Sequence, residues 1–187
     1  MKRSHEPAIW QFDGFLDSED CRALSALARL PRWAEERPGG PINHTGYCVE
    51  VAVEDPRLLD LRARLESLAG MESDIADTFR YRWYRPGEGH RPHLDCYTVE
   101  DRDLLATAMI SLQTTQAGGE TRFPLVGLDF PPVEGRLLLW YNHLPDGEID
   151  PLSRHEGRPV IAGEKEVLLY FFYKQREFAG IRPVESL

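Results

Sequence analysis

The sequence predicts an α+β fold, in which helices near the start of the chain pack outside a sandwich or barrel of strands. Two observations carry this prediction. Helix signals are confined to the chain before residue 71, whereas the apolar stretches from residue 78 onward are β-branched or aromatic and separated by Gly and Pro. The length of 187 residues suffices for one domain with its own core, so we expect a single domain over residues 1–187.

The first two elements follow from apolar content and capping. Residues 8–16, AIWQFDGFL, begin with large apolar side chains and predict a short strand or an extended packing segment. In residues 17–30, either Asp17 or Ser18 can cap a helix. The apolar face of that helix is formed by Cys21, Leu24, Leu27 and Ala28.

The next segments are a loop, a strand and a helix. Residues 31–46 are rich in Pro and Gly and predict a loop, and residues 46–54 alternate in the manner of a half-buried strand. Residues 55–70 give the clearest helix, with Asp55 as its N-cap and Gly70 as its C-terminal cap. Its apolar stripe consists of Leu58, Leu61, Leu65 and Leu68.

Strand-like segments dominate the rest of the chain. They cover residues 78–84, 105–114, 135–142 and 166–174. In the first of them, Arg80, Arg82 and Tyr84 alternate with Phe79, Tyr81 and Trp83. Successive side chains of a strand point to opposite faces, so we expect the first set to line the interior of the barrel and the aromatic set to pack under the helices.

Composition and charge exclude several classes of function. The chain is 42% hydrophobic and 28% charged, as in ordinary globular proteins, and its net charge of −9 disfavours nucleic acid as a partner. No apolar run approaches the roughly 18–20 residues that cross a bilayer, and the N-terminus lacks the apolar core of a signal peptide. The three cysteines show no disulfide or zinc spacing. We therefore expect a cytoplasmic protein without a membrane partner.

The segment HRPHLDCY, residues 90–97, contains a candidate metal site. In a strand, His93 and Asp95 would point to the same side, and His155 could supply a third ligand. Two imidazoles and one carboxylate on one face of an ion leave open positions, which suits non-haem Fe(II) better than zinc. Taken alone, an H-x-D pair is more often a polar pair on the surface than part of a metal site.

Four motifs, in this order along the chain, carry a resemblance to a known family. They are YRPGEGHRPHLD (84–95), AGGETRFP (117–124), GRLLLWYN (135–142) and HEGRPVIAGEK (155–165). Together they resemble the prolyl 4-hydroxylase branch of the 2-oxoglutarate/Fe(II) dioxygenases, and the likeness runs from about residue 8 to residue 173. The resemblance implies a double-stranded β-helix, a jelly-roll barrel with the N-terminal helices packed outside.

The resemblance also implies the roles of individual residues. It assigns Fe(2+) to His93, Asp95 and His155. It assigns the cosubstrate 2-oxoglutarate to Tyr84, Thr121 and Lys165, since an ammonium can pair with the far carboxylate of the keto acid. Without the motif, Lys165 would be explained as a turn lysine and Thr121 as a threonine that begins a strand.

The chain departs from the family pattern where the substrate would bind. It has His90 where peptide-hydroxylating members usually carry a tyrosine, and Phe171 and Phe172 where many members carry a tryptophan. These departures put a collagen-type or proline-rich peptide substrate in doubt. The substrate-contacting candidates are His90, Arg80, Arg82 and Trp140, with structural or packing roles as the alternative for the arginines and the tryptophan.

The implied activity is hydroxylation of a C–H bond by O₂ and 2-oxoglutarate, with release of succinate and CO₂. The substrate would be a prolyl or other amino-acid residue in a protein or peptide, or a free amino-acid-like molecule, and ascorbate is a candidate auxiliary cofactor. The alternative is a catalytically inactive module on the same fold, which binds a metal or a protein.

Overall fold

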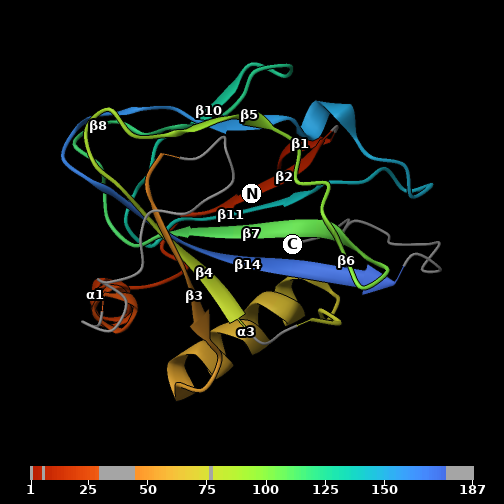
Figure 1. The fold of residues 1–187 in the computed structure, drawn as a ribbon, viewed down its shortest axis with the longest axis horizontal. Coiled ribbons are helices and arrows are strands. Elements are labelled where there is room, and N and C mark those ends of the chain that lie inside the picture. Colours follow the sequence, from red (N-terminus) through yellow and green to blue (C-terminus); the bar gives the residue numbers. More distant parts are fainter. Residues whose placement is uncertain (1, 6, 30–44, 76–77, 176–187) are drawn as a thin grey trace.

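Two layers of β-structure face each other, and two helices cover the outer face of the larger sheet (Figure 1). The computed structural model describes residues 2–5, 7–29, 45–75 and 78–175. The large sheet has eight strands in the order β1–β2–β11–β7–β14–β4–β3, with β6 pairing with β7 beside this path. Its strands are β1 (Lys2–His5), β2 (Ala8–Phe12), β3 (Tyr47–Ala52), β4 (Thr78–Tyr84), β6 (Thr98–Val99), β7 (Arg102–Ser111), β11 (Leu137–Tyr141) and β14 (Lys165–Gln175).

The smaller sheets lie over the opposite face of the large sheet. One has four strands in the order β10–β9–β12–β5, and the other pairs β13 with β8. Their strands are β5 (His90–His93), β8 (Ala117–Gly118), β9 (Thr121–Phe123), β10 (Leu128–Phe130), β12 (His155–Gly157) and β13 (Val160–Ala162). The sheets do not join into one closed barrel, so the architecture is two facing layers of a jelly roll.

The helices are α1 (Ser18–Ala28) and α3 (Pro56–Ala69), and they begin at the expected caps. The Asp17 side chain accepts hydrogen bonds from two backbone amides of α1, and Asp55 accepts one from the first turn of α3. Gly70 ends α3 in the left-handed region, with φ of 67°. A single turn of 3₁₀ helix, η1 (Pro151–Ser153), precedes β12.

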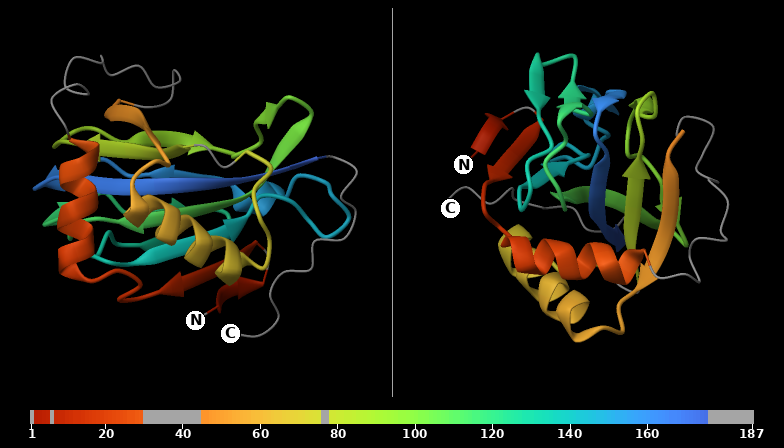
Figure 2. Two further views of the ribbon diagram at one scale, coloured as in Figure 1. Left: turned by 90° about the horizontal axis from the view of Figure 1, so that it is seen from below. Right: turned by 90° about the vertical axis from the view of Figure 1, so that its left-hand side faces the viewer.

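Both helices pack on the same face of the large sheet, where they bury the main hydrophobic core (Figure 2). The buried helical residues are Cys21, Leu24, Ala28, Leu58, Leu61, Leu65 and Ala69. From β4, Phe79 and Tyr81 join this core, whereas Tyr84 belongs to a second core between the sheets. The predicted α+β arrangement with outer helices is confirmed. The alternation expected along residues 78–84 holds except at Arg80, which is partly exposed and pairs with Glu50.

Some expectations differ from the structure or lie outside it. The expectation that His93 and Asp95 lie in one strand is wrong, because β5 ends at His93. The loop expected over residues 31–46 falls mostly outside the described residues, as does the chain after residue 175. Within the described ranges, no helix has both the length and the apolar character needed to cross a bilayer.

Candidate active site

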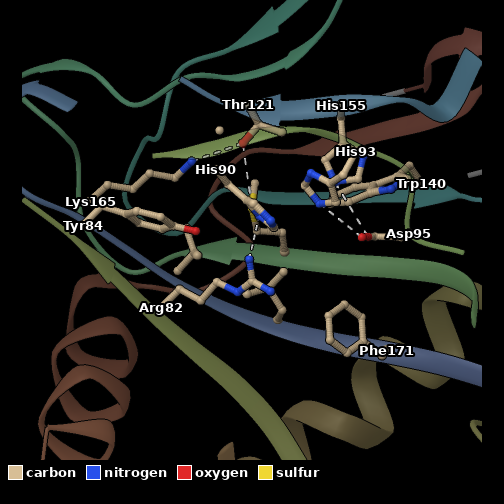
Figure 3. Close-up of a pocket in the computed structure, with 14 residues that line it drawn as sticks. Arg82, Tyr84, His90, His93, Asp95, Thr121, Trp140, His155, Lys165 and Phe171 are labelled. Atoms are coloured by element: carbon tan, nitrogen blue, oxygen red, sulfur yellow. Dashed lines mark hydrogen bonds and ion pairs between the residues drawn. The ribbon is translucent and has the colours of Figure 1, made fainter. Parts of the chain in front are cut away.

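The three predicted metal ligands meet in the space between the two layers (Figure 3). His93 ends β5 and His155 begins β12, and these two residues are direct partners in the antiparallel pairing of the two strands. Asp95 lies two residues beyond the end of β5. One donor atom from each of the three side chains lies within 4.8 Å of the others, so the group could hold one metal ion.

Backbone carbonyls fix the orientation of both imidazoles. Nδ1 of His93 lies 2.8 Å from the carbonyl oxygen of Arg91, and Nδ1 of His155 lies 3.0 Å from that of Ser153. A carbonyl can only accept, so each Nδ1 carries the proton and donates it. Each Nε2 is then left with its lone pair, and the Nε2 atoms lie 3.4 Å and 3.7 Å from the Asp95 carboxylate.

Asp95 is held by Thr107 of the large sheet, and Thr107 is held in turn by Asn142, the residue that follows β11. Thr107 of β7 donates a hydrogen bond of 2.8 Å from its hydroxyl to Oδ2 of Asp95. The side-chain amide of Asn142 donates in turn to the Thr107 hydroxyl over 3.2 Å. Thr107 and Asn142 are almost fully buried, so this chain of bonds fixes the carboxylate in the absence of regular strand structure.

The protonation states of the group suit metal binding at neutral pH. Burial opposes ionisation of Asp95, but His155, His93 and Thr107 together hold its pKa below the usual range. Burial lowers the pKa of His155 to about 4, although Asp95 opposes this shift. Asp95 is therefore an anion and His155 a neutral imidazole near pH 7, so both can bind a cation without first losing a proton.

A buried cation lies at the other end of the same pocket. The Lys165 ammonium at the start of β14 is 4% exposed and donates to the Thr121 hydroxyl over 3.3 Å. It also lies 5.6 Å from the centre of the Tyr84 ring. Burial and the nearby Arg82 lower the pKa of Lys165 to about 8, which marks a position that an anion would stabilise.

The pocket between these two ends holds about 410 Å³ of empty space, part of which is open to solvent. Besides the ligands and the Lys165 group, the pocket is lined by Arg82, His90, Met109, Trp140, Gly157, Val167, Leu169 and Phe171.

The four predicted substrate contacts divide between the pocket and its surroundings. Arg82, His90 and Trp140 line the pocket, and the Trp140 ring centre lies 4.8 Å from that of His155. Arg80 lies outside the lining residues. Its guanidinium pairs with Glu50 over 3.4 Å and lies over the Phe171 ring.

Sequence reasoning missed the residues that support the site. Thr107 lies outside the motifs that carried the resemblance, and Asn142 ends the motif GRLLLWYN without having been assigned a role. Thr107 did offer a signal, because it is a polar residue in the middle of the apolar stretch LATAMIS. A polar side chain in a buried strand needs a partner, and here the partner is Asp95.

Two histidines and one carboxylate between the layers of a jelly roll define the class of non-haem Fe(II) oxygenases. The chain belongs to the 2OG-Fe(II) oxygenase superfamily, whose family model matches residues 79–173. The matched segment contains all three candidate ligands and the Lys165 end of the pocket.

Individual relatives point to one branch of this superfamily. The chain is 28% identical over 179 residues to prolyl 4-hydroxylase subunit alpha-1 of Gallus gallus, a match that covers 87% of this chain and 35% of the relative. It is 32% identical over 123 residues to prolyl 4-hydroxylase subunit alpha-3 of Homo sapiens, covering 60% of this chain and 23% of that protein. The chain thus spans about a third or less of the length of these curated relatives.

Solved structures show the same fold. The viral collagen prolyl hydroxylase of Paramecium Bursaria Chlorella virus-1, in its 2OG complex, matches with a TM-score of 0.73 at 20% identity and covers 88% of this chain and 95% of its own. A Pseudomonas putida prolyl-4-hydroxylase matches with a TM-score of 0.68 at 22% identity, covering 91% and 94%. The expected jelly-roll fold and the resemblance to the prolyl 4-hydroxylase branch are confirmed.

The residues of the site fit the metal and cosubstrate that the family name implies. The donor set offers two Nε2 lone pairs and an ionised carboxylate, the ligand combination typical of mononuclear Fe(II) with open positions. Among the described residues the buried ammonium of Lys165 makes no ion pair with a carboxylate, although the charge of Glu120 acts on it, and this fits a dicarboxylate cosubstrate.

Proposed function

We propose that this protein is a 2-oxoglutarate- and Fe(II)-dependent hydroxylase that acts on a C–H bond. One observation carries the proposal: a two-histidine, one-aspartate group and a buried lysine face the same pocket from opposite ends. Iron with bound 2-oxoglutarate would activate O₂, of which one oxygen atom enters the C–H bond and the other enters succinate, with release of CO₂.

The chain's own residues orient the reactants and exclude water. His93, Asp95 and His155 would hold the metal on one face and leave the other face toward the pocket. Lys165 and Thr121 would bind the far carboxylate of the cosubstrate, and Tyr84 would close that end of the pocket. Apolar side chains surround the remaining space, which keeps the ion pairs strong by lowering the local dielectric.

The proposed substrate is a prolyl or other amino-acid residue, or a small amino-acid-like molecule. The curated relatives are prolyl hydroxylases, and a structural neighbour from Trichoplax adhaerens (TM-score 0.65, 17% identity) is a prolyl hydroxylase bound to a peptide fragment. A screen of proline-containing proteins and free amino acids for the mass gain of one oxygen atom would identify the substrate and the hydroxylated position.

Three smaller proposals accompany this function. Residues 1–187 form one oxygenase domain, a proposal that is supported because both hydrophobic cores combine residues from the early and the late parts of the chain. The protein works in a reducing compartment such as the cytoplasm, which its free cysteines Cys21, Cys48 and Cys96 favour. Ascorbate supports turnover as an auxiliary cofactor, which comparison of product yield with and without it would test.

Two measurements test the main proposal. Anaerobic addition of Fe(II) and 2-oxoglutarate should produce a weak visible charge-transfer band, and exposure to air should release succinate. The substitutions His93→Ala and Asp95→Ala should abolish both signals. The matched controls His143→Ala and Asp129→Ala alter a histidine and an aspartate outside the pocket lining and should retain both.

The outcomes separate the proposal from its alternative. Turnover that survives in either ligand variant would contradict the assignment of the metal site. Formation of the band without any succinate, with every candidate substrate, would instead indicate a metal-binding module without catalysis.

A further inference from the structure

The pocket contains a second buried cation that the proposed chemistry leaves unused. Arg82 lies on β4, which pairs with β14, so it enters the pocket beside Lys165 but on a neighbouring strand. Figure 3 shows its guanidinium below His90, between the Lys165 end and the metal ligands. The side chain is only 7% exposed.

The partners of Arg82 are neutral. Its Nη1 lies 2.8 Å from Nδ1 of His90, and because a guanidinium can only donate, that nitrogen accepts and His90 is a neutral imidazole. A second hydrogen bond joins Arg82 to Tyr84. Its Nε has no hydrogen-bond partner among the described residues, and within the same residues no ion pair includes Arg82. Its neighbour Arg80, in contrast, pairs with Glu50.

The charges in the pocket leave one positive charge over. The charged side chains in the lining are Arg82, Lys165 and Asp95, which together carry one net positive charge. Fe(II) and the 2-oxoglutarate dianion cancel each other, so loading the site does not change this sum. A buried charge without a counter-charge is costly, and the loaded pocket therefore favours one further monoanion.

The position of Arg82 indicates what kind of anion this is. The two carboxylates of the cosubstrate already have partners in the metal and Lys165. A guanidinium presents a planar pair of donors that matches a carboxylate, and apolar walls formed by Trp140, Leu169 and Phe171 surround the space next to it. An internal residue of a peptide chain has no backbone carboxylate to offer.

We propose that Arg82 binds the carboxylate of the prime substrate, which is a small free acid of the amino-acid type. This inference rests on the proposed hydroxylase function and narrows its substrate class. His90 is a positioning residue in this arrangement, because it holds the guanidinium through Nδ1 while its ring stacks on His93 with 3.7 Å between ring centres.

The test observes the guanidinium itself by NMR. The protein is loaded with Zn(II), a diamagnetic substitute for Fe(II), and with saturating 2-oxoglutarate. The Nε–H signal of Arg82 is assigned by its loss in Arg82→Lys. Acetate and L-proline are then added at millimolar concentration, and the matched neutral probes acetamide and L-prolinamide are added in parallel. We expect a saturable shift of the Arg82 signal with both acids and with neither amide.

Variants give a second readout. Titrated through the ring signals of His90, binding of acetate should weaken about tenfold or more in Arg82→Gln, the loss expected for one charge-assisted hydrogen-bonded pair. Arg80→Gln, which removes an arginine two positions away on the same strand, should retain the response.

Each outcome decides the question. An Arg82 signal that shifts when 2-oxoglutarate is added but then ignores both acids would assign Arg82 to the cosubstrate and overturn the proposal. A signal that responds equally to acids and amides, or to none of the probes, would overturn it as well. Failure of the hydroxylase proposal is distinguishable, because it would show as an absence of succinate in the turnover assay, whereas the Arg82 response is read from NMR signals without turnover.

Discussion

Replacement of Thr107 by valine should weaken metal binding without touching a metal ligand. The Thr107 hydroxyl donates to the Asp95 carboxylate over 2.8 Å. Thr107 is not itself a metal ligand, so it acts on the metal only through Asp95. Valine keeps the branched shape of threonine and removes the hydroxyl. Asp95 then lies beyond the end of β5 with nothing from β7 to fix its orientation.

The size of the effect follows from the kind of bond that is lost. A hydrogen bond to a charged group contributes about 1.5–3 kcal/mol, and each 1.4 kcal/mol changes an equilibrium constant about tenfold. Loss of an outer partner of a metal ligand typically lowers metal affinity by about 10–100-fold. We therefore expect Thr107→Val to bind Fe(II) about 10–100-fold more weakly, and Thr107→Ser, which keeps the hydroxyl, to retain most of the affinity.

Anaerobic titration with Fe(II), followed by competition with a chelator, measures this affinity directly. Thr115→Val serves as the matched control, because the Thr115 hydroxyl also donates a partly buried hydrogen bond, over 3.0 Å, but to the backbone carbonyl of Glu164. A Thr107→Val protein whose iron affinity stays within about twofold of the Thr115→Val control would refute the reasoning, since the valine would then have cost no more than an ordinary lost hydrogen bond.

Three further predictions concern the cosubstrate, a glycine of β8 and the helix-facing core. Burial and Arg82 lower the pKa of Lys165 to about 8, and 2-oxoglutarate binds the protonated ammonium, so the affinity for 2-oxoglutarate should fall roughly tenfold per pH unit above about pH 8. Calorimetry should find this slope removed in Lys165→Arg, and a flat wild-type profile would contradict the role of Lys165. Gly118→Ala places a Cβ 2.5 Å from a backbone oxygen at φ of 75°, whereas Gly127→Ala has a similar φ but meets open space. Urea denaturation should therefore show a larger loss of stability for Gly118→Ala than the roughly 1–2 kcal/mol expected for Gly127→Ala. Equal losses would exclude the steric argument. Tyr81→Phe removes a 2.7 Å hydrogen bond to the buried Glu166 carboxylate and should lower the free energy of unfolding by about 1–3 kcal/mol, a loss that an unchanged urea midpoint would disprove.

Local signals along the chain predicted the helices and long strands well. Asp17 and Asp55 cap α1 and α3 as expected, because capping depends on neighbours only a few residues away. The short strands β8, β9, β12 and β13 could not be predicted by periodicity, since two or three residues contain no repeat to detect. Their pairing depends on segments far away in the sequence.

The sequence predicted the metal-binding residues of the site, but not the hydrogen bonds that hold them in place. Motif spacing identified His93, Asp95 and His155, and the structure brings them together. The bonds that orient them come from the carbonyls of Arg91 and Ser153, which any residue type could supply and which therefore leave no trace in the sequence. The charge left over at Arg82 is likewise a property of the folded pocket, because it depends on which acidic residues are absent nearby.

The two histidines of the metal group are cross-strand partners, so metal binding depends on the alignment of β5 with β12. A slip of one residue between β5 and β12 would turn one imidazole to the opposite face of the small sheet, and the ion would lose a ligand at once. The pairing alone does not complete the centre, because Asp95 and its partner Thr107 lie in the chain that connects the two strands. Iron uptake during folding would in this way select the molecules whose strands have found their correct neighbours.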